Sequence, residues 1–186
     1  MFFTVRDGKA GLGSDHLYVY GPSTHSTSTP FSFTYLGAPL TGRRSNPYIH
    51  GINSINGRLH VTWVWRGFVS YPGWDDPLDT KHKQQAGPNG AENNHNICYA
   101  WSDDAGYTWH NGRGDVIASL KDGETITEDS DGIVAFDISK GSGLMNQEAQ
   151  AIDWDGGVHV LNREIHEDKD ELRWRHYYRS PEGMCF

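Results

Sequence analysis

The sequence predicts an all-β protein made of short antiparallel strands, and three observations lead to this fold class. First, runs with alternating apolar and polar residues recur along the whole chain, as half-buried strands require. Second, no stretch of a dozen residues keeps the 3.6-residue period of an amphipathic helix. Third, 22 Gly, 7 Trp and 9 Tyr stand among the 186 residues, a composition typical of strands joined by turns.

The expected strands follow one another with turn residues between them. The opening FFTVRDG is itself interpreted as a strand that ends in a turn. Asn56-Gly57 and Asp155-Gly156 are dipeptides that form tight hairpin turns, so each is placed between two strands. The other expected strand regions are residues 16–21, 31–37, 56–67, 96–102, 132–138, 149–164 and 172–180.

Charge and cysteine content exclude several classes of protein. The formal net charge is −8, which argues against a nucleic-acid footprint because that requires clustered positive charge. No apolar run reaches the length needed to span a membrane. Cys98 and Cys185 are too few for a disulfide framework, and we expect free, buried thiols.

An internal repeat relates three parts of the chain. GRLHVTWVWRG and GGVHVLNREI share a Gly, an apolar residue and a His-Val pair before a strand that ends near an Arg. His60 and His159 are about two blades apart if a propeller blade takes ~40–50 residues. Arg6, Arg66 and Arg163 close the three similar strands, so radial repetition would direct them toward one axis.

The segment SDDAGYTW combines five residue types that suit one β-hairpin turn, and we interpret it as structural. The side chains of Ser102 and Asp104 suit hydrogen bonds to backbone N–H groups within the turn, as does Thr108. Gly106 suits a positive φ angle. Trp109 is expected to fold back onto the hairpin as an apolar anchor.

Residues 71–92 interrupt the succession of expected strands. This segment is rich in Pro, Gly, Asp and Lys and shows no period. Loops of this length are usually functional or disordered, so we predict an insertion loop over one face. The rest of residues 1–186 is expected to form one partial domain.

The chain resembles a known family over nearly its whole length. The octet that begins at Ser102 is similar to the Asp box of BNR repeats in sialidase-like propellers, and the ordered set of motifs resembles the BNR-repeat family that includes ulvan-lyase-like polysaccharide lyases. The resemblance extends from about Phe2 to the C-terminus. The motifs that carry it are NPYIHGI, GRLHVTWVWR, NNHNICYAWSDDAGYTW, LMNQEAQAIDWDGG and HYYRSPEG.

This resemblance implies a seven-bladed β-propeller with four-stranded antiparallel blades. Seven blades at about 45 residues each exceed the length of this chain, which has room for roughly four. We therefore expect a fragment or truncated product. A smaller propeller, or an assembly completed by a second chain, is the alternative. The family role suggests secretion, although no signal peptide is found in this chain and its localisation stays unknown.

The same resemblance implies a polysaccharide lyase that cleaves an acidic, uronate-containing polysaccharide by β-elimination. Such a reaction needs a cation for the carboxylate, a base for the C5 proton and an acid for the leaving oxygen; Arg, His and Tyr suit these roles. A carbohydrate-binding propeller without turnover and a sialidase-like hydrolase are the two alternatives. The expected partner is an acidic polysaccharide or oligosaccharide, with no nucleic acid and no membrane, and the oligomeric state stays unknown.

The candidate site residues follow from the resemblance and from residue chemistry. His50 and His95 stand in the motifs to which the family assigns catalytic histidines, while His60 and His159 are expected in the core. Near the position where active lyases have a Tyr, this chain has Asn162-Arg163. The acid role would then pass to Tyr177 or Tyr178, or the chemistry differs, or the protein only binds sugar. The predicted catalytic residues are His50, His95, Tyr178 and Arg179, and the predicted substrate-binding residues are Arg66, Asn146, Gln147, Arg163 and Tyr177.

No cofactor is expected for this chemistry. The ten His residues leave room for a structural metal ion between blades, although neither His-x-His nor Cys-x-x-Cys spacing is present.

Overall fold

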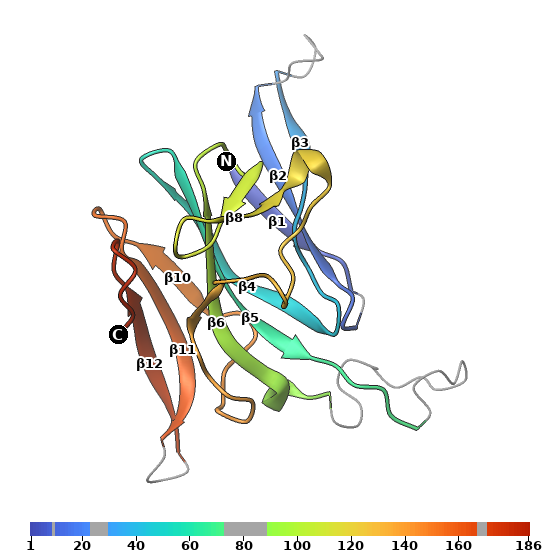
Figure 1. The fold of residues 1–186 in the computed structure, drawn as a ribbon, viewed down its shortest axis with the longest axis vertical. Helices are drawn as coiled ribbons and strands as arrows, with labels where there is room; N and C mark the ends of the chain where they lie inside the picture. Colours follow the sequence, from blue (N-terminus) through green and yellow to red (C-terminus); the bar gives the residue numbers. More distant parts are fainter. Residues whose placement is uncertain (9, 23–29, 73–88, 167–170) are drawn as a thin grey trace.

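A computed structural model describes residues 1–8, 10–22, 30–72, 89–166 and 171–186, and these form three antiparallel sheets (Figure 1). Most of the predicted insertion loop, residues 73–88, lies outside the described residues. The strands are β1 (Phe2–Arg6), β2 (Ser14–Pro22), β3 (Phe31–Thr41), β4 (Ser45–Ile55), β5 (Arg58–Gly67), β6 (Asn94–Ser102), β7 (Thr108–His110), β8 (Val116–Ser119), β9 (Val134–Phe136), β10 (Ala149–Ile152), β11 (Val158–His166) and β12 (Glu171–Arg179).

The sheets follow chain order and confirm the all-β fold class. The first sheet has the order β1-β2-β3 and the last β10-β11-β12, and between them lies the central sheet β4-β5-β6-β7-β8, with β9 added beside β6 (Figure 1). Three sheets stand where chain length predicted about four blades, because residues 120–148 contain only β9 and one turn of 3₁₀ helix.

Helical structure is confined to two short turns in the described part of the chain. These are η2 (Ala91–Asn93) and η3 (Leu120–Asp122), both 3₁₀ helices. In the ranges that the structure describes, no helix has the length and apolar character needed to cross a bilayer.

Two apolar clusters lie on opposite faces of the central sheet. Successive side chains of a strand project to opposite faces, so β5 contributes to both clusters. Trp63 and Trp65 belong to the cluster on the side of β1–β3, whereas Val64 belongs to the cluster on the side of β10–β12. The second cluster is formed by Tyr48, Val64, Ile97, Tyr99, Ile138, Leu144, Val158, Val160 and Tyr177.

The internal repeat corresponds to β1, β5 and β11, which carry Arg6, Arg66 and Arg163. The guanidinium carbons of Arg6 and Arg66 lie 3.9 Å and 6.0 Å from the ring centre of Tyr48. The first two guanidinium groups therefore lie near the same ring, whereas the repeat predicted that all three would point toward one axis. Arg163 instead contacts the sulfur of Met145.

The SDDAGYTW turn has the geometry that its residue types predicted. The carboxylate of Asp104 accepts hydrogen bonds from the Ser102 hydroxyl at 2.8 Å and from the Thr108 N–H at 2.7 Å. The Ser102 oxygen accepts the N–H of Gly106, which has φ +95°. Trp109 is fully buried and donates its indole N–H to the Gly106 carbonyl at 2.9 Å.

Candidate functional site

A buried imidazole lies between the central sheet and the C-terminal sheet. His50 on β4 is 8% exposed, and its Nε2 lies 3.1 Å from the Asn162 side-chain nitrogen. Because that amide nitrogen is a donor, Nε2 is the acceptor and Nδ1 carries the proton. Nδ1 donates to the Thr62 hydroxyl at 3.1 Å, and that hydroxyl donates to Gln150 Oε1 at 2.6 Å. Partners from three strands thus fix one tautomer.

Burial determines the charge of this imidazole. Desolvation lowers the pKa of His50 to about 4, because the buried site disfavours the charged form. His50 is therefore neutral near pH 7 and presents a proton acceptor at Nε2.

The low pKa of His50 makes stability depend on pH. A histidine with a pKa of about 6.5 in the unfolded chain and about 4 in the folded chain stabilises the fold above pH 6.5 and loses that contribution as pH falls through 4. We expect the loss to total about 3 kcal/mol relative to a His50→Gln variant. Urea unfolding of both proteins between pH 7.5 and pH 4 measures it. A difference that stays constant with pH contradicts the prediction, and His16→Gln, at a partly exposed position, is the control.

A layer of amide side chains surrounds the segment at residues 144–146. The Asn94 amide nitrogen donates to the Leu144 carbonyl at 2.7 Å and to Asn146 Oδ1 at 2.9 Å. Asn162 Oδ1 accepts the N–H of Met145 at 2.9 Å. Asn94 Oδ1 is buried, and the layer therefore retains one buried acceptor without a hydrogen-bond partner.

Arg163 presents a cation beside this layer. Its Nη2 donates to the Met145 sulfur, while its Nε is buried without a hydrogen-bond partner. The side chain lines a cavity of about 350 Å³ together with Glu92, Leu144 and Leu172. Asn162 and Arg163 are neighbours on β11, and neighbouring residues of a strand face opposite ways. Met145 nevertheless contacts both side chains: its N–H bonds Asn162 and its sulfur contacts Arg163.

The structure does not bring His95 to His50. His95 pairs with Trp65, and cross-strand partners project to the same face. It therefore lies on the Trp65 side of the sheet, whereas His50 bonds Thr62 on the other side. Its Nδ1 donates to the Asn93 carbonyl at 3.1 Å. The ring lines a separate cavity of about 390 Å³ with Arg44, Glu128, Asp129 and Lys140.

Tyr178 and Arg179 lie at the other end of the C-terminal sheet from Arg163. Arg163 pairs with Trp174 and Arg179 pairs with Val158, a separation of five residues, or about 17 Å along the strand. This is the end at which the Asp box lies, called the Asp-box end below. Asn162, which bonds His50, pairs with Arg175, four residues along β12 from Arg179. The predicted grouping of His50, His95, Tyr178 and Arg179 in one site is therefore corrected: strand direction separates Tyr178 and Arg179 from His50, and strand alternation separates the two histidines.

The remaining predicted binding residues fall in different environments. Tyr177 is 3% exposed and packs edge-on against Phe136 in the second apolar cluster, so it is a core residue and the prediction of substrate contact is wrong. Arg66 is 3% exposed and donates to the Asn89 carbonyl, so its guanidinium is occupied within the protein. Gln147 is exposed, while Asn146 joins the amide layer.

Sequence reasoning missed the partners of His50. Asn162 is fully buried and follows Val158 and Val160 on the apolar face of β11. A polar residue at the third inward position of such a strand is the signal that could have identified it, because a buried amide requires partners.

The His and Cys side chains form neither a metal-binding cluster nor a disulfide in the described part of the chain. In residues with described positions, no group of three or more His, Cys, Asp or Glu side chains could hold a metal ion. Both cysteines are free; Cys98 is buried as predicted, but Cys185 is exposed.

Sheets that follow chain order, with the SDDAGYTW turn on the central sheet, define a protein of the β-propeller class. The chain belongs to the BNR repeat-containing family, whose sequence profile matches residues 1–184. A comparison with curated protein sequences found no match.

Solved structures of polysaccharide lyases share this fold. The crystal structure of polysaccharide lyase Uly1 superposes with a TM-score of 0.60 at 15% identity, covering 100% of this chain and 37% of the lyase. The structure of a PL25 ulvan lyase bound to -[GlcA(1-4)Rha3S]- has a TM-score of 0.61 at 13% identity and covers 100% of this chain and 39% of the lyase. The chain thus spans about two fifths of the length of these neighbours.

Proposed function

We propose that this chain contributes to a polysaccharide lyase that acts on uronate-containing polysaccharides by β-elimination. The observation that carries the proposal is the His50–Asn162 hydrogen bond, which joins two sheets and holds a neutral imidazole with Nε2 as acceptor. The similarity of the chain's fold to solved polysaccharide lyases supports the reaction class.

In the proposed reaction His50 is the base. Substrate binding draws the Asn162 amide away from Nε2, which then takes the C5 proton of the uronate. The electron pair of that C–H bond forms the C4–C5 double bond while the C4–O bond breaks. Where the proton and the leaving oxygen lie on the same face of the sugar, the same imidazolium returns its proton to O4. Thr62 keeps Nδ1 oriented through the transfer.

Arg163 supplies the positive charge that makes the C5 proton removable. A guanidinium binds a carboxylate through two parallel hydrogen bonds and keeps its charge at every working pH. Within the described residues no ion pair to a carboxylate is found at Arg163, and its Nε is buried without a hydrogen-bond partner. The amide layer of Asn94 and Asn146 is suited to the hydroxyl groups of the same sugar.

The test is incubation of the chain with a glucuronate-containing polysaccharide. We expect ultraviolet absorbance from the unsaturated uronide to rise with new reducing ends. His50→Gln is expected to reduce the rate at least 100-fold, the usual scale for loss of a general base. Arg163→Gln is expected to lower kcat as well as raise KM, because the charge of Arg163 stabilises the transition state. His16→Gln is the matched control, since it alters a partly exposed histidine of the first sheet.

The other outcomes decide between the alternatives. Reducing ends without absorbance would indicate hydrolysis and contradict elimination. Retarded migration in a gel that contains the polysaccharide, without either product, would indicate a binding protein. Full activity in His50→Gln would remove His50 from the mechanism.

A further inference from the structure

The first sheet carries a row of aromatic rings on the face that is turned away from the central sheet, called the first outer face below. Phe2 and Leu17 pack in the first apolar cluster, and neighbouring residues of a strand face opposite ways. Phe3 and Tyr18, which pair with each other, therefore lie on the outer face. The rings of this face belong to Phe3, Tyr18, Tyr20, Phe31, Phe33 and Tyr35.

The pattern of β3 is the reverse of the one that a sheet with a face in water usually shows. Its aromatic residues are between 51% and 61% exposed, whereas Ser32 and Thr34 lie on the side of the core. Antiparallel sheets with one wet face usually place apolar residues inward and polar residues outward. The outward rings also contact one another: the Phe33 ring centre lies 5.4 Å from that of Phe3 and 4.9 Å from that of Tyr20. They form one continuous apolar surface.

The last sheet also has an apolar face that is turned away from the central sheet, called the last outer face. Val158 and Val160 of β11 pack in the second apolar cluster, so His159 between them faces outward. The His159 ring stacks on the His176 ring, with centres 5.0 Å apart and planes at 5°, and Trp174 is 60% exposed. The last outer face is formed by His159, Leu161, Leu172, Trp174, His176 and Tyr178.

These two outer faces stand at the two ends of one series of stacked sheets. The central sheet packs one face against the first sheet and the other face against the last sheet (Figure 1). Within the described residues, each end sheet therefore has one face packed against a sheet and one face without a sheet against it. A further sheet laid on either outer face would repeat a contact that the fold already makes twice.

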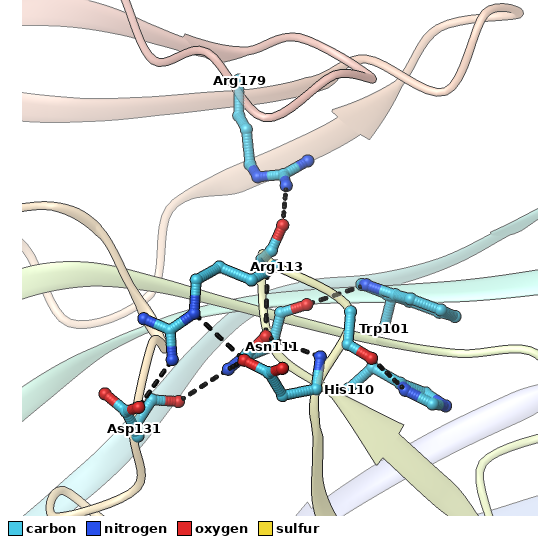
Figure 2. A network of polar contacts seen from close by, with 9 residues as sticks. Trp101, His110, Asn111, Arg113, Asp131 and Arg179 are labelled. Carbon is cyan, nitrogen blue, oxygen red and sulfur yellow. Dashed lines mark hydrogen bonds and ion pairs between the residues drawn. The ribbon is translucent and has the colours of Figure 1, made fainter.

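The turns at the Asp-box end have a different character. Arg113 donates to Asp115 at 3.0 Å and to Asp131 at 2.6 Å, and Arg179 donates to the Gly112 carbonyl at 2.9 Å (Figure 2). The buried centres of protein interfaces are depleted of charged residues. We therefore expect association through the two outer faces and not through this end.

We propose that the first outer face of one copy of this chain packs on the last outer face of a second copy. Such a contact joins two different surfaces, so it is heterologous and leaves one outer face free at each end of a dimer. The four most exposed rings of the first outer face together expose roughly 400 Å², taking about 200 Å² for a whole aromatic side chain. That is roughly half of what one partner contributes to a standard interface.

A second copy suits this surface better than a polysaccharide does. Sugar hydroxyl groups require placed polar partners, and the side chains of Phe3, Phe31 and Phe33 offer none. The last outer face supplies rings and leucine side chains, which pack on apolar rings as they do between the sheets. The proposal is independent of the proposed elimination, because His50 lies between two sheets and on neither outer face.

The test is sedimentation velocity of the full chain from micromolar to near-millimolar concentration. We expect the average mass to rise with concentration from one chain toward two or more. Phe33→Lys alters the first outer face and Trp174→Lys the last, at positions that are 61% and 60% exposed, so both variants should keep the natural circular dichroism spectrum. Because burial of an unpaired ammonium group is costly, each variant alone should associate about tenfold more weakly or less. Val116→Lys, 60% exposed on β8, adds the same charge away from both faces and should associate as the natural sequence does.

A mixture of the two variants tests which faces meet. Phe33→Lys keeps an intact last outer face and Trp174→Lys an intact first outer face, so an equal mixture should form a dimer and nothing larger. Association that is lost in Phe33→Lys but kept in Trp174→Lys would mean that two first outer faces meet, and would overturn the proposal.

Two further results would also overturn it. One is the mass of a single chain for the natural sequence at every concentration. The other is retardation of the natural sequence, but not of Phe33→Lys, in a gel that contains the polysaccharide, without any self-association; the aromatic face would then bind sugar. His50→Gln should associate as the natural sequence does, so failure of this proposal is distinguishable from failure of the lyase assignment.

Discussion

Trp109→Ala is expected to lower the free energy of unfolding by about 4 kcal/mol, the usual cost of truncating a buried large aromatic residue. Trp109 is fully buried in the first apolar cluster. The substitution removes both the packed ring and the hydrogen bond from its indole N–H to the Gly106 carbonyl. Because the same turn depends on that bond, the loss extends to the β6–β7 connection. Urea unfolding followed by tryptophan fluorescence and circular dichroism measures the change.

Trp154→Ala is the matched control for this prediction. Trp154 is 90% exposed, so its removal should change the free energy of unfolding by less than about 0.5 kcal/mol. If both variants lose stability equally, Trp109 is not the anchor of the Asp-box turn.

Local patterns predicted most strands because their causes are local, although β4 was not among the expected regions. Alternation and turn dipeptides placed β2, β5 and β12 within a few residues of their bounds. The expected strand region at residues 149–164 contains β10 and β11, joined by the predicted turn with Asp155-Gly156. β7 and β8 were missed as separate strands, since each is at most four residues long, too short for a period to show.

The site was less predictable because it depends on convergence of distant residues. His50 meets Asn162 across 112 positions, and no local pattern encodes such a pair. Tyr178 and Arg179 were grouped with His50 from the family resemblance and residue chemistry, without the strand direction that sends them to the Asp-box end. Of the three arginines of the repeat, Arg6 and Arg66 lie near the Tyr48 ring and Arg163 contacts Met145, so the common axis for all three stays a prediction.

The stability of the fold is also expected to depend on a buried carboxyl group on β2, that of Asp15. Asp15 is 3% exposed, and its Oδ2 has no hydrogen-bond partner. Burial raises the pKa of Asp15 to about 7, although the nearby Arg6 acts in the opposite direction. The unfolded chain ionises this carboxyl near pH 4, so the folded chain holds a proton that the unfolded chain lacks between about pH 4 and 7. The contribution of Asp15 to stability is therefore present below pH 4 and is lost as pH rises through 7.

Asp15→Asn should therefore have a free energy of unfolding up to about 4 kcal/mol higher than the natural sequence at pH 8. At pH 4 the two free energies should be nearly equal. The amide keeps the shape of the side chain and removes the cost of ionising it in a buried site. Urea unfolding across this pH range gives the difference directly, and Asp129→Asn, an exposed position, should show no such trend. A stability gain that is the same at pH 4 and pH 8 would mean that packing, and not ionisation, distinguishes the two side chains. A loss at pH 8 would show that the Asp15 charge is needed beside Arg6, whose own Nη1 is buried without a hydrogen-bond partner.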